Sequence, residues 1–202
     1  MCMVRAMTRA YTRSGPDARR QSLIEAAGRV LAARGAPGAS VRTICAAAGV
    51  SPGLLRHYFD GIDALIADTY RWTGERVTRA LAEAVHAAGP DPRERLLAYV
   101  TASFREPIAD PELLATWIAF WSMIKANAEM GGLHREIYAE YRHGLEALLG
   151  ECGLAPEAVR LGAVAVTALV DGLWLELCLA PEAFTAEEAA AIAEKWIGTL
   201  LT

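Results

Sequence analysis

The chain has 202 residues, of which 53% are hydrophobic and 22% charged, so it can bury a core without disulfides and is too apolar to be intrinsically disordered. Its net charge of −4 is unevenly spread, because residues 1–60 carry nine basic and three acidic side chains whereas residues 61–202 carry eleven and twenty-one. A basic segment joined to an acidic body indicates that the first 60 residues face a polyanion.

The hydrophobic spacing is helical along the whole chain, with no alternating strand pattern, hairpin turn or repeat, so we predict an all-α protein of about nine helices. Serine, threonine and aspartate caps, first-turn prolines and terminal glycines such as Gly35 mark the helix ends. The predicted helices span residues 16–34, 40–48, 51–58, 60–88 (capped by Asp60), 91–106, 110 to the Gly131-Gly132 pair, that pair to 149, 156–179, and 185–200.

These helices divide the chain into three parts. Residues 1–14 are expected to be a disordered basic arm, residues 15–60 a three-helix head, and residues 61–202 a helical body. Because one long predicted helix begins at the boundary near residue 60, we expect the head and the body to be joined rigidly.

The chain is expected to be soluble and cytoplasmic. The stretch from Leu161 to Ala180 is long and apolar, but Asp171 and Glu176 in it would each cost about 2.5–3.5 kcal/mol in a bilayer. We therefore predict a buried helix. No signal peptide is visible at the start of the sequence. The four cysteines have neither the spacing of disulfide pairs nor that of metal ligands, which is typical of reduced thiols. They are Cys2, Cys45, Cys152 and Cys178.

The segment from Ile44 to Leu55 has the pattern of a helix-turn-helix. Gly49 supplies the left-handed backbone that a tight turn between two short helices needs, and Cys45 and Ala48 are small where those helices would meet. The second helix would expose Gly53, Leu54, Arg56 and His57, with Tyr58 nearby. A bare backbone followed by arginine and histidine suits entry into a DNA major groove.

With these residues the chain resembles the TetR family of bacterial transcriptional regulators. The matching segments are Arg19–Ala27, Val41–Ile44, Ala48–Ser51, Gly53, and His57–Phe59 with Leu65. The Gly-x-x-x-His-Tyr-Phe ending is similar to the BetI branch, which represses choline-to-betaine genes, as are the body segments Trp117–Trp121 and Leu169–Trp174.

The resemblance implies a non-enzymatic, cofactor-free repressor that binds a pseudo-palindromic DNA operator. It implies an all-helical homodimer whose last two helices form a four-helix interface, and a small-molecule effector that loosens DNA binding. The sequence departs from the family at Ile62, where a phosphate-binding lysine is usual, and at Cys45, where alanine is common. The isoleucine should remove one phosphate contact. The slope of the logarithm of the DNA-binding constant against the logarithm of salt concentration should then be shallower by about 0.9.

Site residues can be assigned by role. Leu54, Arg56 and His57 are candidates for base edges, and Arg9 and Arg13 could reach a flanking groove. The DNA-contact set is completed by Gly53 and by candidates for phosphate oxygens, namely Ser40, Arg42, Thr43, Ser51 and Tyr58. Candidates for the dimer contact are Asp171, Gly172, Trp174 and Trp196, in which glycine would let two helices approach closely.

The body is rich in aromatic side chains, which around a cavity would attract a quaternary ammonium such as choline through cation–π interactions. Asp171 or Glu176 nearby would favour such a cation. The predicted ligand-binding residues are Trp72, Trp117, Phe120, Trp121 and Trp174. Aromatic residues at helical spacing can also be ordinary core, and a regulator of an efflux or catabolic operon with another effector stays an alternative.

A helical di-iron enzyme is the remote alternative. Glu83 and His86, and Glu140 and His143, form two Glu-x-x-His pairs on separate predicted helices, the spacing that di-iron bundles use. Such a centre also needs two further inward-facing glutamates. Glu83 and His86 lie off the apolar stripe of their helix, which favours a solvated surface.

Overall fold

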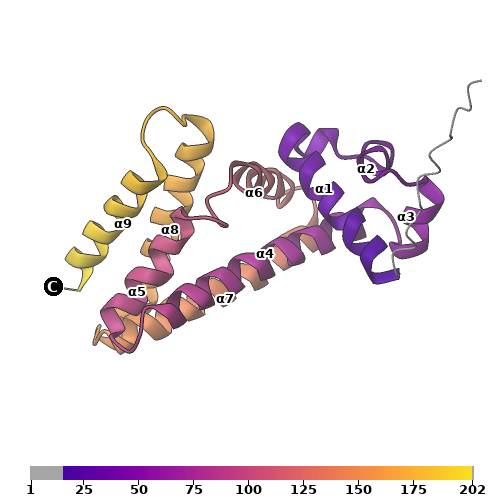
Figure 1. Ribbon diagram of the computed structural model, residues 1–202. Helices are drawn as coiled ribbons and strands as arrows, with labels where there is room; N and C mark the ends of the chain where they lie inside the picture. The colour runs from indigo at the N-terminus through magenta and orange to yellow at the C-terminus, as the bar shows by residue number, and fades with distance from the viewer. Residues whose placement is uncertain (1–15, 202) are drawn as a thin grey trace, which may run out of the picture.

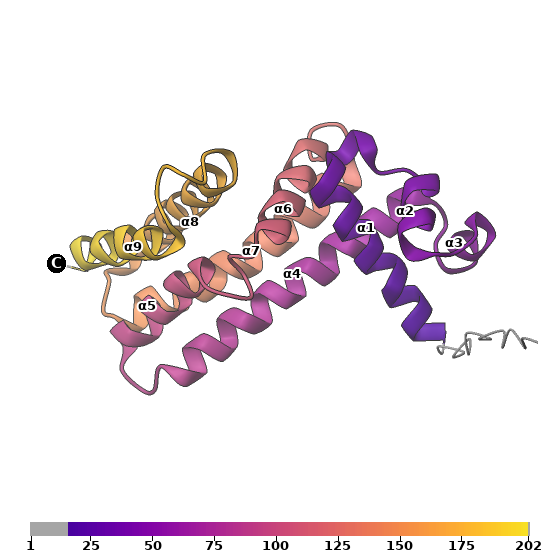
Figure 2. The same cartoon turned by 45° about the horizontal axis from the view of Figure 1, so that its top comes forward.

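The computed structural model describes residues 16–201, and over that range the protein is built from helices alone (Figures 1 and 2). This confirms the predicted all-α class. The helices are α1 (Pro16–Gly38), α2 (Val41–Ala48), α3 (Pro52–Tyr58), α4 (Ile62–Ala87), α5 (Pro92–Thr101), the 3-10 turn η1 (Ala102–Phe104), α6 (Pro111–Met123), α7 (Ala128–Glu151), α8 (Pro156–Leu179) and α9 (Ala186–Leu200). The predicted arm, with Cys2, Arg9 and Arg13, lies outside the described residues.

Most helix starts follow the cap and proline signals of the sequence. Asp91 and Asp110 accept hydrogen bonds from the backbone N–H groups of Glu94 and Leu113, both at 2.9 Å, and Thr185 forms a capping box with Glu188. Gly35 has φ +62°, so the regular helix of α1 breaks there, although a further turn continues to Gly38.

Three predicted boundaries are wrong. Asp60 does not cap α4, because the helix starts after Gly61 and has no side-chain cap. The helix that begins at Pro92 gives way to η1 after Thr101 and does not reach residue 106.

The Gly131-Gly132 pair also fails to break the chain and lies inside α7, which is capped by Asn127. Gly131 is buried at a close approach, since a Cβ there would lie 3.3 Å from the Ile124 backbone oxygen. Gly131 therefore allows close packing near the start of α7, and the pair does not end a helix.

The head packs around its own apolar cluster. Leu23, Ala27 and Ile44 are fully buried there. The cluster also includes Leu55 of α3 and Leu65 of α4, so the first turns of α4 help to complete the head. Ala39 and Ile62 pack against both this cluster and the larger one in the body.

The body is organised around two long helices. In Figures 1 and 2, α4 leaves the head and runs beside α7 to the opposite end of the molecule, where α5 and the start of α8 lie. The two long helices pack closely, because a Cβ on Gly74 of α4 would lie 3.2 Å from Ile137 of α7. Helices α8 and α9 form the side of the body away from the head.

Helix α8 is long and apolar enough to cross a membrane by length and composition alone. In this fold its inner side is buried against the rest of the body, with Ala163, Val166 and Val170 inaccessible or nearly so. Asp171 and Trp174 on the same helix make hydrogen bonds to other helices of the body. The helix is thus part of the protein core.

Helix α6 joins the body to the head. It packs extensively against α1, and the hydroxyl of Thr116 donates a hydrogen bond to the backbone oxygen of Gly28 at 3.2 Å, shared with that of Glu112 at 2.8 Å. A second tie forms between α1 and α4, where the Arg20 guanidinium binds the Asp68 carboxylate. The head is therefore braced against the body at two places.

Candidate DNA-binding surface and buried cavity

The turn between α2 and α3 has the geometry that the sequence predicts. Gly49 adopts φ +66° and ψ 33°, a left-handed conformation that costs glycine no steric clash. Its N–H closes α2 by bonding to the Ala46 and Cys45 backbone oxygens. Cys45 is buried where α2 packs, and burial raises the pKa of its thiol, so it is an unreactive core residue.

Three residues expected to contact phosphate take part in capping helices. Ser40 and Thr43 form a capping box at the start of α2, and the Thr43 hydroxyl also donates to the Gly38 backbone oxygen at 2.9 Å. The Ser51 hydroxyl accepts from the Leu54 N–H at 3.3 Å at the start of α3. Their hydroxyls therefore hold the helix ends, where backbone N–H groups are available to an anion.

The remaining predicted DNA residues lie on the outer side of the head. Arg42, Gly53, Arg56 and His57 are exposed, whereas Leu54 and Tyr58 are half-buried. The Tyr58 ring contacts the His57 ring edge-on at 4.9 Å between centroids and also packs against the head core. The structure thus brings Gly53, Arg56 and His57 together on the exposed side of one helix.

The fold of the subunit does not require a glycine at position 53. A Cβ at this position would meet only the Ser51 hydroxyl, at 3.8 Å, which is an ordinary contact. Glycine inside a helix is otherwise unfavourable by about 0.5–1 kcal/mol relative to alanine. The contacts within the subunit therefore give no reason for a glycine at position 53.

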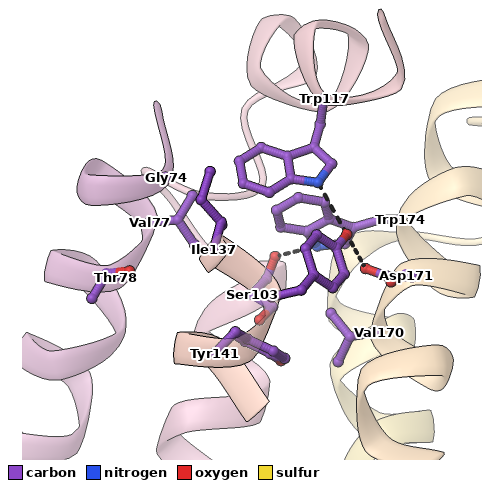
Figure 3. A pocket seen from close by; sticks show the side chains of 11 residues that line it. Gly74, Val77, Thr78, Ser103, Trp117, Ile137, Tyr141, Val170, Asp171 and Trp174 are labelled. Atoms are coloured by element: carbon purple, nitrogen blue, oxygen red, sulfur yellow. Dashed lines mark hydrogen bonds between the residues drawn. The ribbon is translucent and has the colours of Figure 1, made fainter. Parts of the chain in front are cut away.

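The body contains a small cavity, shown in Figure 3. Its walls come from α4, η1, α6, α7 and α8, so five separate elements meet around it. The lining is mostly apolar and aromatic and includes one carboxylate: Gly74, Val77, Thr78, Ser103, Trp117, Ile137, Tyr138, Tyr141, Val170, Asp171 and Trp174.

A hydrogen-bond network fixes the polar end of this cavity. The Tyr138 hydroxyl accepts from Trp117 Nε1 at 3.2 Å and donates to Asp171 Oδ1 at 3.0 Å (Figure 3). It also accepts from Trp121 Nε1 at 3.1 Å. Because the phenol gives its only hydrogen to the carboxylate, the network is suited to an ionised Asp171.

No basic side chain lines the cavity beside Asp171. Burial raises the pKa of Asp171 to about 6, while the Tyr138 hydrogen bond and the charge of Arg142 lower it. An ionised carboxylate surrounded by aromatic rings is an electrostatic environment that favours a cation.

Of the predicted ligand residues, Trp117 and Trp174 line the cavity, with ring centroids 5.8 Å apart at 89°. Trp121 does not line the cavity, but its indole N–H donates a hydrogen bond to Tyr138, which does. Phe120 is core and stacks on Tyr70 at 4.3 Å. Trp72 does not line the cavity, although Gly74 of the same helix does; its ring lies under the guanidinium of Arg76.

The residues predicted for the dimer contact separate into two groups. Asp171 and Trp174 line the cavity, and Trp174 Nε1 donates to the Ser103 backbone oxygen at 2.8 Å. Gly172 is exposed, with no atom within 4 Å of where a Cβ would stand, and Trp196 is half-buried. Glu176, expected beside the ligand, is exposed.

The four residues of the di-iron alternative are solvent-exposed: Glu83, His86, Glu140 and His143. Three of them line an open groove between α4, α5 and α7 and not the middle of the bundle. Over residues 16–201, no group of three or more histidine, cysteine, aspartate or glutamate side chains is placed to hold a metal ion.

The predicted ligand set left out Ser103, Tyr138 and Tyr141, although the two tyrosines are among the aromatic residues of the body that the sequence analysis considered for a cavity. Tyr138 and Tyr141 stand three apart on α7, the spacing that puts two side chains on one face of a helix. That spacing could have drawn attention to them. Ser103 had no such signal, because its position depends on the 3-10 turn that follows α5.

Comparison with known proteins gives two family matches. Residues 23–69 match the model described as bacterial regulatory proteins, tetR family, and residues 92–202 match the one described as BetI-type transcriptional repressor, C-terminal. The HTH-type transcriptional regulator BetI of Vibrio atlanticus is 30% identical over 190 residues, covering 93% of this chain and 94% of that protein.

Solved structures share the fold. A transcriptional regulator from Pseudomonas aeruginosa PAO1 has a TM-score of 0.85 and 41% identity, covering 95% of this chain and 94% of its own. A transcriptional regulator from Saccharomonospora viridis, solved in complex with choline, has a TM-score of 0.78 and 17% identity, covering 90% and 96%.

Proposed function

Because the chain belongs to the tetR family of bacterial regulatory proteins and has a BetI-type C-terminal domain, we propose that it is a dimeric repressor released from DNA by a small cationic effector such as choline. That it is a transcriptional regulator follows from the family. The effector, the residues that carry each role, the division into a DNA-binding head and a regulatory body near residue 60, and a cytoplasmic location belong to the proposal.

The DNA-binding role of the head rests on α3. Arg56 and His57 are exposed and follow a bare, exposed Gly53, so the helix can lie close to base edges in a major groove. Ser40 and Ser51 cap helices whose free N–H groups would then meet phosphate oxygens.

The effector role of the cavity rests on one observation, the Asp171 carboxyl group held by Tyr138 among the rings of Trp117 and Trp174. A quaternary ammonium cannot donate a conventional hydrogen bond, so it is bound by charge and by aromatic faces. The choline complex of a protein with the same fold supports this choice of effector class.

The route from the cavity to the head is proposed to run through α6. Trp117 of this helix lines the cavity, and the neighbouring Thr116 contacts Gly28 of α1. An effector that displaces the Trp117 ring would therefore move the helix that braces α1. Such a shift would change the spacing of two recognition helices, which must match half-sites roughly 34–36 Å apart.

The dimer is proposed to form through the outer sides of α8 and α9. Leu161, Val164, Ala168 and Gly172 repeat at three or four residues along the exposed side of α8, and Ile192 of α9 is also exposed. An apolar stripe of this kind, with a glycine at which a Cβ would meet nothing in its own subunit, fits a second copy of the same surface.

The test is fluorescence anisotropy on the duplex upstream of the protein's own gene, at several salt concentrations, with and without choline. Salt-steep binding that choline relieves is the expected result. Binding that choline, up to millimolar levels, does not relieve would overturn the proposed effector. Binding no tighter than to random duplex would overturn the proposed operator.

Gly53→Ala and Gly49→Ala form a matched pair for the DNA-binding surface. Gly53→Ala is expected to weaken DNA binding at least tenfold without lowering the melting temperature, because its Cβ fits the subunit. Gly49→Ala is expected to lower the melting temperature, since an alanine at φ +66° is strained by about 1–2 kcal/mol. Unchanged DNA affinity in Gly53→Ala would exclude a close approach of DNA at α3.

A further inference from the structure

Two tyrosines one helical turn apart on α7 line the same cavity but differ in their hydrogen bonds. The Tyr138 hydroxyl has three partners, two indole N–H donors and the Asp171 carboxylate. The Tyr141 hydroxyl is buried and has no hydrogen-bond partner among the described residues. Figure 3 shows the Tyr141 side chain on the cavity wall.

The environment of Tyr141 keeps its hydroxyl protonated. Burial raises its pKa far above the ordinary value, Tyr99 and Asp171 add to the rise, and Ser103 lowers it. The Ser103 side chain is thus close by, yet no hydrogen bond forms between the two hydroxyls. A protonated phenol can donate one hydrogen bond and accept others, and it costs free energy to leave it unpaired away from water.

The fold does not need this hydroxyl. The Tyr141 ring packs on the Tyr99 ring at 5.3 Å, and Tyr99 donates to the Tyr141 backbone oxygen at 3.0 Å, so phenylalanine at position 141 would keep both contacts. A buried polar group without a partner in the protein, on the wall of a ligand cavity, is explained by a partner on the ligand.

We propose that the Tyr141 hydroxyl recognises an oxygen of the effector, so that the cavity selects cations that also carry a hydroxyl or carbonyl group. This inference rests on the proposed cationic effector and adds a second requirement to it. The cationic group would lie near Asp171 and the aromatic rings, and the oxygen-bearing end near Tyr141 and Ser103. A cation with only alkyl substituents would leave the Tyr141 hydroxyl unpaired and would bind more weakly.

The test compares choline with ethyltrimethylammonium, which is choline without its hydroxyl, by isothermal titration calorimetry. The unsubstituted protein is expected to bind choline about tenfold more tightly, which is the effect of roughly one buried hydrogen bond. In Tyr141→Phe the affinity for choline is expected to fall to that for ethyltrimethylammonium, while the affinity for ethyltrimethylammonium stays unchanged.

Melting temperatures of the ligand-free proteins separate this role from a structural one. Tyr141→Phe is expected to melt at the same temperature as the unsubstituted protein or a few degrees above it, because the lost hydroxyl had no partner. The control is Tyr138→Phe, which makes the same chemical change one turn earlier and is expected to melt lower, since three hydrogen bonds are lost.

Several results would overturn the inference. A Tyr141→Phe protein that melts several degrees lower would show that the hydroxyl has a structural partner. If Tyr141→Phe lowered the affinity for both ligands equally, or did not lower the affinity for choline, the proposed hydrogen bond to the effector would be overturned. The proposed cationic effector would stand. Failure of the unsubstituted protein to bind either ligand would overturn the proposed effector class, and this inference with it.

Discussion

At the scale of single residues, the most consequential side chain is Asp171. A carboxylate buried among aromatic rings is costly unless it meets a cation, and burial accordingly raises its pKa to about 6. Tyr138 donates a hydrogen bond to it, but no basic side chain lines the cavity. The ligand-free subunit thus carries a charge that a cationic effector would neutralise.

Asp171→Asn tests this account. The amide keeps the size of the side chain and removes the charge, so choline affinity at pH 7.5 is expected to fall at least tenfold in calorimetry, with no loss of melting temperature. The control is Glu176→Gln on the exposed side of the same helix, which should bind choline normally. Unchanged choline binding in Asp171→Asn would contradict the role of the carboxylate.

The same group predicts a pH dependence. Its pKa of about 6 in the folded protein exceeds the usual value near 3.9 in an unfolded chain, so this group adds stability as the pH falls from about 6 toward 4 and the stability is lost as the pH rises. Choline needs the ionised form, so its affinity is expected to fall as the pH drops below 6, by up to about tenfold at pH 5. Asp171→Asn should lack this fall.

Ile62 shows how one residue can serve two needs. It opens α4, at the position where the family resemblance leads us to expect a phosphate-binding lysine, and it is half-buried against the apolar clusters of both head and body. Isoleucine at this position packs between the head and the body but, unlike lysine, offers no positive charge to a DNA phosphate.

Ile62→Lys is expected to steepen the salt dependence of DNA binding by about 0.9 per subunit in log–log units. It should also lower the melting temperature by a few degrees because packing at the junction is lost. Anisotropy titrations between low and physiological salt would measure the slope, and Glu75→Lys, exposed further along α4, is the charge control. Equal slopes for Ile62→Lys and the control would rule out a phosphate contact at this position.

At the scale of elements, local signals identified nearly all the helices. Ser40, Ser51, Asp91, Asp110 and Thr185 all cap helices as their sequence context predicts. The failures arose where tertiary contacts decide. Gly131 lies in α7 at a close approach to the chain before it, and glycine patterns alone do not distinguish that role from a helix end.

The candidate site was less predictable than the helices. Trp117 and Trp174 of the predicted aromatic set meet at the cavity, whereas Phe120 and Trp72 lie in or near other packing regions. Sequence spacing identifies the buried side of a helix but not which buried side chains leave a space between them. That depends on how five elements meet.

Helix α6 makes an element-scale prediction, because its Thr116 hydroxyl binds α1 while Trp117 lines the cavity. Thr116→Val keeps the shape and removes the hydrogen bond to Gly28. Choline and DNA affinities measured separately are expected to change less than threefold. The factor by which saturating choline weakens DNA binding is expected to fall about twofold to tenfold, the effect of one hydrogen bond.

Thr167→Val is the matched control, since the buried Thr167 hydroxyl binds only the Ala163 backbone oxygen within α8. It should leave the choline effect on DNA binding unchanged. An unchanged effect in Thr116→Val as well would place the coupling between cavity and head outside the α6–α1 contact.

At the scale of the whole molecule, DNA binding is expected to depend on the dimer while effector binding is not. The cavity is lined by residues of one subunit, whereas a pseudo-palindromic operator needs two heads at a fixed spacing. The proposed interface and the cavity can therefore be separated by mutation, although α8 is part of both proposals.

Gly172→Arg is expected to convert the dimer to a monomer, because a Cβ there meets nothing in the subunit but would enter the apolar stripe on α8. Light scattering should show the mass of one chain, with choline affinity kept and operator affinity reduced at least a hundredfold. Glu83→Arg, exposed on α4, is the control and should stay dimeric. A dimeric Gly172→Arg protein would place the interface on another surface.

The continuity of α4 across the junction also bears on unfolding. The core of the head includes Leu65, and Trp72 packs against it. The first turns of α4, a helix that lies mainly in the body, therefore form part of the core of the head. Ala39 and Ile62 pack on both cores at once. Unfolding of either core would expose part of the other, so the subunit is expected to melt in a single cooperative transition. A fragment that ends at residue 60 would lack Leu65 and the other α4 residues that complete the core of the head.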